Sequence, residues 1–169
     1  MKLTIIVLLL LLTSAFGQTM KQVEKAAKAR AKSEGDRPVV TELACTPERT
    51  TTTIIRVMSE NHYRMTSESS HLLHFSKPLT DLGELPFWMM PVGGRNVTLD
   101  KQVNFLMAPG NSRVELSGDI EYIANADRQN LQVTRMNGNW RWRYELETLV
   151  SAITEAARIS CATTALDVK

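Results

Sequence analysis

The chain has 169 residues, of which 43% are hydrophobic and 22% are charged, and its formal net charge is +2. This composition excludes a disordered chain, which is poorer in apolar residues, and a cysteine-dense mini-scaffold. About 150 residues follow the apolar leader described next, which is the usual size of one domain with its own core.

The first seventeen residues have the parts of a secretion signal. Lys2 gives a positive start, a run dominated by leucine and isoleucine extends from Leu3 to Leu12, and Ala15 and Gly17 are small residues at the positions that a signal peptidase reads. A transmembrane anchor is the alternative, but the run is shorter than the roughly 20 residues that a helix needs to cross a bilayer. No cysteine that a lipoprotein would acylate follows it. We expect a signal peptide (1–17) cleaved after Gly17 and an extracytoplasmic protein, periplasmic or secreted.

Residues 18–37 form an Ala/Lys-rich arm with six basic and three acidic residues, whereas 38–169 carry thirteen basic and fifteen acidic residues. The arm has helix formers but little to bury, which favours a frayed helix or a solvated tether. A second interpretation is a weak contact with anionic lipid headgroups or another acidic polymer. The lysines of that contact are Lys21, Lys25, Lys28 and Lys32. Gly35 to Pro38 breaks the pattern and marks the entry to a single domain, residues 38–169.

The two cysteines, Cys45 and Cys161, lie near opposite ends of this domain. In an oxidising compartment an even pair favours a disulfide bond, which would stabilise the domain by restricting its unfolded state. The alternative, a nucleophilic Cys45, has no local sequence signature.

A helix is expected to begin after Thr46, because Pro47 suits the first helical position and Glu48 suits the first turn. The β-branched run from Thr50 to Thr53 leaves a strand as the alternative. Asn61 is a reasonable stop. Residues 63–67 and 71–77 are then expected to be two short strands, and residues 79–94 a loop.

The clearest pattern is a hairpin of two long strands. Val97, Leu99, Val103, Phe105 and Met107 alternate with polar residues and are interrupted by Lys101, and residues 114–122 alternate in the same way after the turn at 109–112. A second hairpin is predicted around Asn137 and Gly138, the favoured dipeptide of a tight turn, with Val133 opposite Trp142. An amphipathic helix from about Glu145 to Cys161 closes the chain.

These elements predict an α+β two-layer sandwich: an antiparallel sheet of about five or six strands, with an N-terminal helix and a C-terminal helix packed on one face. The outline is that of a helix-grip domain, which by itself carries no function.

No residue pattern in the chain demands a catalytic chemistry. His71 and His74 are spaced for a helix but lie in an expected strand, and adjacent Met89 and Met90 would point apart, so neither a zinc nor a copper site is predicted. Glu115, Asp119 and Glu121 share one strand face without a second group that would form a cleft. We therefore predict no catalytic residue, no cofactor, no metal and no nucleic-acid partner.

Two candidate contact surfaces remain. One is the aromatic and basic alternation of residues 140–144, in which Arg141 and Arg143 would face an anionic ligand; the alternative is a sheet face with a polar back. The other is the proline-bounded apolar loop at 85–91, which is either an exposed contact or a core plug. Its contact residues are Phe87, Trp88, Met89 and Met90. Asn96 also begins an N-glycosylation sequon, whose use depends on the host cell.

Two classes of function are therefore carried forward. The first is a non-enzymatic binding or assembly module that contacts an unknown protein or envelope component. The second is a carrier that holds a small apolar ligand between the closing helix and the sheet.

Overall fold

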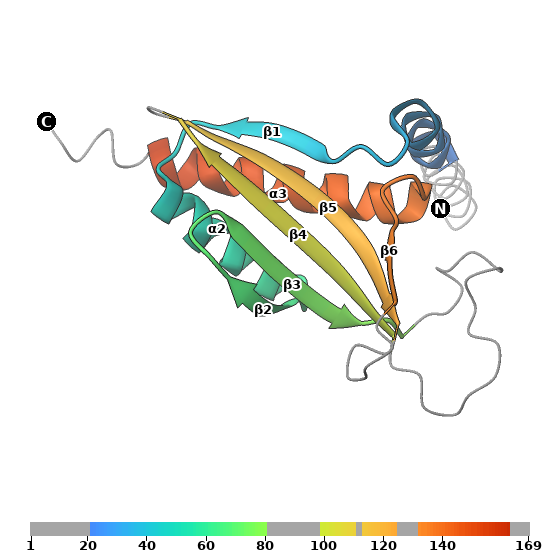
Figure 1. Ribbon diagram of the computed structural model, residues 1–169. Helices are drawn as coiled ribbons and strands as arrows, with labels where there is room; N and C mark the ends of the chain where they lie inside the picture. The colour runs from blue at the N-terminus through green and yellow to red at the C-terminus, as the bar shows by residue number, and fades with distance from the viewer. Residues whose placement is uncertain (1–20, 81–98, 111–112, 125–131, 163–169) are drawn as a thin grey trace, which may run out of the picture.

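The computed structural model describes residues 21–80, 99–110, 113–124 and 132–162. Within them the chain forms an α+β sandwich of two layers, with one antiparallel sheet and with helices packed on one of its faces (Figure 1). The fold class expected from the sequence is confirmed.

The sheet has six strands in the order β1-β5-β4-β3-β2, and β6 also pairs with β5. Their bounds are β1 Val39–Leu43, β2 Arg64–Glu68, β3 Leu72–Pro78, β4 Leu99–Pro109, β5 Val114–Ala124 and β6 Gln132–Arg135. The long β4–β5 hairpin is the one that the alternation predicts. Strands β1 and β6 share one side of β5, because β1 pairs with residues 114–118 and β6 with residues 121–124.

Helix α2, Pro47–Glu60, begins and ends where the sequence predicts. Its N-cap is Thr46 and its C-cap is Asn61, whose side-chain amide also donates to the carbonyl of Val57 at 2.8 Å. The β-branched run does not convert it to a strand, because Thr50 and Thr53 lie one turn apart on the inward stripe, with Ile54, Val57 and Met58. The tertiary packing of this stripe outweighs the weak local propensity.

The predicted second hairpin is wrong in its second arm. Residues 132–135 form β6 as expected, but their partner is β5, and Trp142 lies in helix α3, Trp140–Ala162. The helix starts here because Asn139 caps it: its side-chain oxygen accepts the backbone N–H of Arg141 at 3.1 Å. The turn at Asn137 and Gly138 does form, closed by the N–H of Asn139, which donates to the carbonyl of Met136 at 2.9 Å, but it leads into α3 and not into a second strand. Asn137 also stabilises the fold with its side chain. The buried side-chain oxygen of Asn137 accepts a hydrogen bond from the N–H of Ile120 at 2.8 Å, and its side-chain amide donates to the carbonyls of Asp36 and Arg37.

The core lies between the sheet and the two helices, α2 and α3. Its largest fully buried apolar side chains are Leu43, Ile54, Met58, Leu73, Phe75, Phe105, Leu116, Ile120, Trp142, Leu146 and Ile153. Helix α3 packs closely on β5 at Gly118, where an added Cβ would lie 3.2 Å from Leu146 and 3.1 Å from the ring of Phe105. The absence of a side chain at Gly118 therefore sets how closely α3 can approach the sheet.

Residues 21–34 are helical and are called the basic helix below. This helix lies at the N-terminal end of α3 (Figure 1), and its buried residues are Ala27 and Ala31. Arg30 lies 3.3 Å from Glu147, and Arg143 pairs with Glu34. The arm thus has a buried alanine stripe, which is narrower than the apolar stripe of an ordinary amphipathic helix but sufficient for close helix packing.

Candidate functional site

An ion cluster lies between α3 and the covered face of the sheet. The carboxylate of Glu145, on α3, accepts three hydrogen bonds. They come from the ammonium groups of Lys101 at 2.5 Å and Lys77 at 2.7 Å, and from the hydroxyl of Tyr63 at 2.9 Å. Lys101 is almost completely buried, with 1% of its surface exposed, whereas the side chains of Glu145 and Lys77 are about a quarter exposed. The cluster reaches from the core to the solvent.

The strand register explains why the cluster needs an acid. Lys77 and Lys101 stand opposite each other on β3 and β4, and like charges in that position destabilise a sheet. Glu145 lies between them. Burial raises the pKa of its carboxyl, but the hydrogen bonds and positive charges of Lys101 and Lys77 outweigh burial, and the net effect is a lowered pKa. The acid is therefore held in its charged form.

Aromatic rings enclose the two lysines. The ammonium group of Lys101 lies 4.8 Å from the ring centre of Trp142, and that of Lys77 lies 4.4 Å from the ring centre of Tyr63. All the donors around Glu145 are directed at its two oxygens, so this carboxylate has little free capacity to act as a base. The arrangement fixes α3 on the sheet, which is a structural task.

The other face of the sheet is not covered by α2 or α3, and it carries an ordered chain of polar side chains. The side-chain oxygen of Asn104 accepts a hydrogen bond from the side-chain amide of Gln102 at 2.7 Å, and it lies 2.7 Å from Nδ1 of His74. The Asn104 amide then donates to Glu121 at 2.9 Å. These residues come from β3, β4 and β5. This chain of hydrogen-bonded side chains therefore links three neighbouring strands into one rigid surface.

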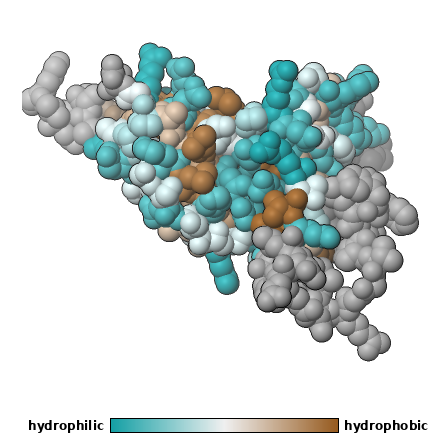
Figure 2. All heavy atoms as spheres, in the orientation of Figure 1, coloured by the Kyte–Doolittle hydropathy of each residue, from teal (hydrophilic) through white to brown (hydrophobic). Residues whose placement is uncertain are grey.

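Three apolar side chains lie in one row across the same face, interrupted by Ser117. The register places Val40 opposite Ser117, Ser117 opposite Leu106, and Leu106 opposite Leu72. Val40 is 54% exposed and Leu106 is 52% exposed. Figure 2, which views this face, shows hydrophobic spots separated by hydrophilic surface. We call this surface, with its polar chain and its apolar row, the open face.

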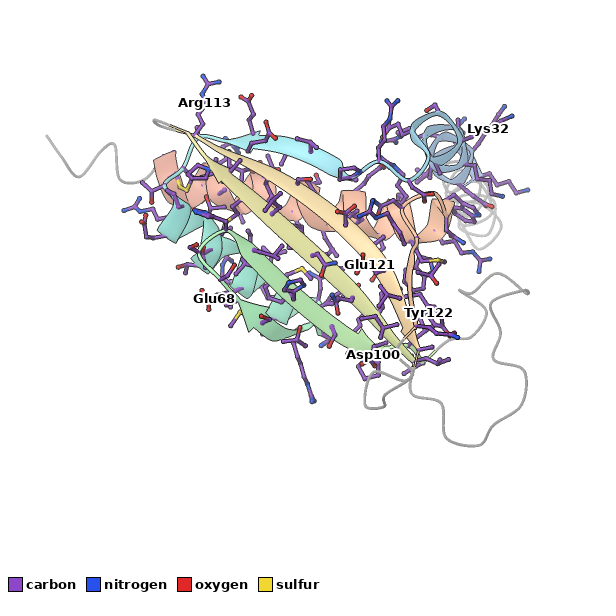
Figure 3. All side chains as sticks on the ribbon, viewed as in Figure 1. Lys32, Glu68, Asp100, Arg113, Glu121 and Tyr122 are labelled. Atoms are coloured by element: carbon purple, nitrogen blue, oxygen red, sulfur yellow. A yellow bond between two sulfur atoms is a disulfide. The ribbon has the colours of Figure 1, made fainter. Side chains whose placement is uncertain are left out.

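The open face is acidic along its two central strands. Four carboxylates point to it from β4 and β5, and those two strands place no lysine or arginine on this side. They are Asp100, Glu115, Asp119 and Glu121, of which Asp100 and Glu121 are labelled in Figure 3. Among the described residues, the lysines and arginines of this face lie at its margins: Arg135 lies 3.8 Å from Asp119, Arg113 lies 3.1 Å from Glu42, and Arg64 lies on the edge strand β2.

The two arginines proposed as contacts have different environments. Arg141 is exposed and lies over the ring of Trp140 at 5.4 Å, but Arg143 is buried, with 2% exposed. Arg143 donates to the carbonyl of Arg37 at 2.8 Å and to Glu147 at 3.1 Å. The structure thus does not bring both guanidinium groups to one surface, because a helix, unlike a strand, turns residues two apart to different sides. The predicted contact residues Phe87, Trp88, Met89 and Met90 lie outside the described residues.

The four lysines of the arm, Lys21, Lys25, Lys28 and Lys32, are all exposed on the basic helix. At the other end of the domain, Cys45 and Cys161 form a disulfide-compatible pair with their Cα atoms 5.6 Å apart. This pair joins the start of α2 to the end of α3.

The described residues bring together no group of three or more His, Cys, Asp or Glu side chains that could hold a metal ion. None of the helices that those residues form is both long and apolar enough to cross a membrane.

Sequence reasoning missed the ion cluster, although one signal for it was visible. Lys101 interrupts the apolar alternation of its strand, and a charged residue on a core-facing position requires a partner. The partner, Glu145, is 44 positions further along the chain. Nothing local identifies it, because an acid in the first turns of a helix is also explained by the helix dipole.

Comparison with known proteins gives only a distant likeness in fold. The sequence matches no protein family and no curated protein. A crystal structure of a TBP-like protein from Parabacteroides distasonis is similar in fold, with 9% sequence identity and a TM-score of 0.39. The match covers 73% of this chain and 94% of that chain.

Proposed function

We propose that the protein is a non-enzymatic binding module of an extracytoplasmic compartment, and that it takes a basic, partly apolar segment of a partner protein on the open face. The observation that carries the proposal is the apolar row, in which Val40 and Leu106 are each more than half exposed on a rigid face that the helices leave uncovered. Exposed apolar side chains on a face that the described helices leave uncovered support an interaction site.

The charge of the open face selects the kind of partner. Its two central strands carry four carboxylates and no lysine or arginine on this side, and Arg135 of the neighbouring β6 is the basic residue that reaches them, 3.8 Å from Asp119. A segment that carries lysine or arginine around an apolar residue would complement this charge. Glu115 is exposed, and Asp119 and Glu121 are partly exposed on the same strand.

The ion cluster and the polar chain support such a role because they make the surface rigid. A surface that is already ordered before binding loses less conformational entropy when a partner docks. The predicted leader and the disulfide-compatible cysteine pair support the extracytoplasmic location.

The second function class, a carrier of a small apolar ligand, gains no support from the structure. The space between α3 and the sheet, where the ligand would lie, is occupied by core side chains including Trp142, Phe105 and Leu146, each with 0% of its surface exposed.

Site-specific photo-crosslinking tests the proposal. A photoreactive amino acid is introduced at Leu106, and separately at Val40, in the cell that makes the protein. Arg56, exposed on α2 beyond the covered face, is the matched control position. Crosslinked products are separated by mass, and the crosslinked peptide of the partner is sequenced.

We expect Leu106 and Val40 to give the same protein adduct, through a peptide that carries net positive charge, and Arg56 not to give it. If Leu106 gives no adduct, or if Arg56 gives the same one, the open face is not the binding surface. An adduct through an acidic peptide would contradict the charge argument.

A further inference from the structure

The start of α3 and the basic helix together form a second surface, separate from the open face. Trp140, Tyr144 and Val23 line a shallow hollow of about 200 Å³ between the two helices. Tyr144 is 43% exposed and Val23 is 42% exposed. Apolar side chains from two helices, two of them aromatic, therefore meet at one place on this surface, beside Lys21 and Glu24.

The basic helix carries a line of four lysines, of which Lys21 lines the hollow and Lys28 lies over the ring of Trp140. Lys21, Lys25, Lys28 and Lys32 are spaced by four, three and four residues, which places them on one side of a helix. All four are exposed, and Figure 3 shows Lys32 projecting away from the sheet. At a rise of 1.5 Å per residue, the line is roughly 16 Å long.

The lysines and the rings belong to one surface. The ammonium group of Lys28 lies 4.8 Å from the ring centre of Trp140, and the guanidinium group of Arg141 lies 5.4 Å from the same ring. Among the residues that line the hollow, the acidic one is Glu24, which pairs with Lys28 at 2.6 Å. The positive charge therefore exceeds the negative charge beside the rings.

We infer that this surface docks the protein onto an anionic lipid bilayer. Tryptophan and tyrosine are the side chains that settle at the headgroup level, where one end of the ring is apolar and the other is hydrated. Lysines beside them attract anionic headgroups, and their long stems let the charge follow the mobile lipid surface. An acidic protein partner is less favoured than lipid, because fixed carboxylates are usually bound by the planar fork of arginine, whereas this surface carries four lysines and one arginine, Arg141.

The inference is independent of the proposed function. The lipid surface and the open face use different residues, so a partner protein can dock on the sheet whether or not the basic helix binds lipid. If both proposals hold, the protein presents its partner at a membrane surface.

Vesicle co-sedimentation tests the inference. The full chain is expressed, and its exported product is mixed with vesicles of phosphatidylcholine alone or with about 30 mol% phosphatidylglycerol, at low and high salt. The test variant changes Lys21, Lys25, Lys28 and Lys32 to Gln. The matched control changes four exposed arginines elsewhere to Gln, so that the net charge falls equally. They are Arg56, Arg64, Arg113 and Arg158.

We expect binding to the anionic vesicles to exceed binding to the neutral vesicles by at least about tenfold at low salt, because each lysine near such a surface contributes roughly fivefold. The lysine variant should lose about tenfold or more of this binding, and the arginine control should keep most of it. Tyr144→Ser should weaken binding by about fivefold at either salt concentration, because it removes an apolar contact.

Equal binding to both vesicle types overturns the inference, and so does a lysine variant that binds like the original chain. Binding of the protein to soluble polyglutamate but not to anionic vesicles would also overturn it, in favour of an acidic polymer. The crosslinks from Leu106 should be the same in the lysine variant, so the two proposals fail separately.

Discussion

Replacing Glu145 by leucine should destabilise the fold through Lys101. The change removes the carboxylate that lies 2.5 Å from a lysine with 1% of its surface exposed. Breaking a buried ion pair by removing one partner costs about 3–5 kcal/mol. Glu145 is itself 27% exposed, and Lys101 keeps its contact with the ring of Trp142, so we expect a loss of about 2–3 kcal/mol.

The double variant separates this explanation from simple loss of packing. Adding Lys101→Met to Glu145→Leu removes the buried charge as well, and an apolar pair in place of an ion pair is often neutral. Most of the lost stability should return. The measurement is the free energy of unfolding from urea titration, and Glu155→Gln, an exposed position on the same helix, is the control that should leave the midpoint unchanged.

Two results would refute the reasoning. The first is a Glu145→Leu variant that unfolds with the same free energy as the original chain. The second is a Lys101→Met change that gives no recovery in the Glu145→Leu background, which would show that the cluster's charges do not determine the effect.

The same carboxylate should make the stability depend on pH. Its pKa in the folded protein is lowered, whereas the unfolded chain has the ordinary value of about 4.3. The ionised carboxylate therefore stabilises the fold fully above the unfolded value, and this contribution is lost as the pH falls through the lower folded value. The stability difference between the original chain and Glu145→Gln should be constant near neutral pH and should shrink below about pH 4. A difference that grows in acid would contradict the direction of the shift.

Three further substitutions test single features of the fold, each by urea unfolding. Gly118→Val should cost about 1–3 kcal/mol, because a side chain there meets Phe105 and Leu146, and an unchanged midpoint would mean that α3 does not approach β5 so closely. Asn137→Ala should cost about 2–3 kcal/mol because it leaves the buried N–H of Ile120 without its acceptor, and a near-neutral effect would show that water replaces it. Thr50→Val should raise stability by about 1 kcal/mol, since the buried hydroxyl of Thr50 has no hydrogen-bond partner among the described residues, and a loss of stability would indicate that it has one.

The parts of the fold that the sequence predicted are those whose signals are local. The β4–β5 hairpin follows from alternation along each strand, and the start of α2 follows from Thr46, Pro47 and Glu48. Strand β1 was missed because Val39–Leu43 is a five-residue edge strand, whose pairing with β5 depends on residues 71 or more positions away.

The wrong arm of the second hairpin shows how two local signals compete. Trp140, Trp142 and Tyr144 alternate with arginines as in a strand, while Asn139 is a helix cap and Trp142, Leu146 and Leu149 have helical spacing. The helix forms because its apolar stripe extends over several more turns, to Ala157, whereas the alternation ends at Tyr144. Because residues 140–144 were expected to form a strand, Arg143 was predicted to lie on a contact surface, whereas in the helix it is buried.

The two proposed surfaces depended even more on tertiary structure. The open face combines residues of β1, β3, β4 and β5, and only the register shows that Val40 and Leu106 belong to one row. The lysine line is visible in the sequence, but the position of Trp140 and Tyr144 beside it is not, because α3 begins about 120 residues after the first of these lysines.

The central claim is that the protein binds a basic partner through the open face, and the most direct test is the salt dependence of crosslinking from Leu106. The yield of the partner adduct is measured in the extracytoplasmic fraction as ionic strength is raised. We predict a strong adduct at low salt that weakens steadily as the carboxylates of β4 and β5 are screened. A Leu106 position that gives no adduct at any salt concentration, or an adduct whose yield rises with salt, would contradict the claim.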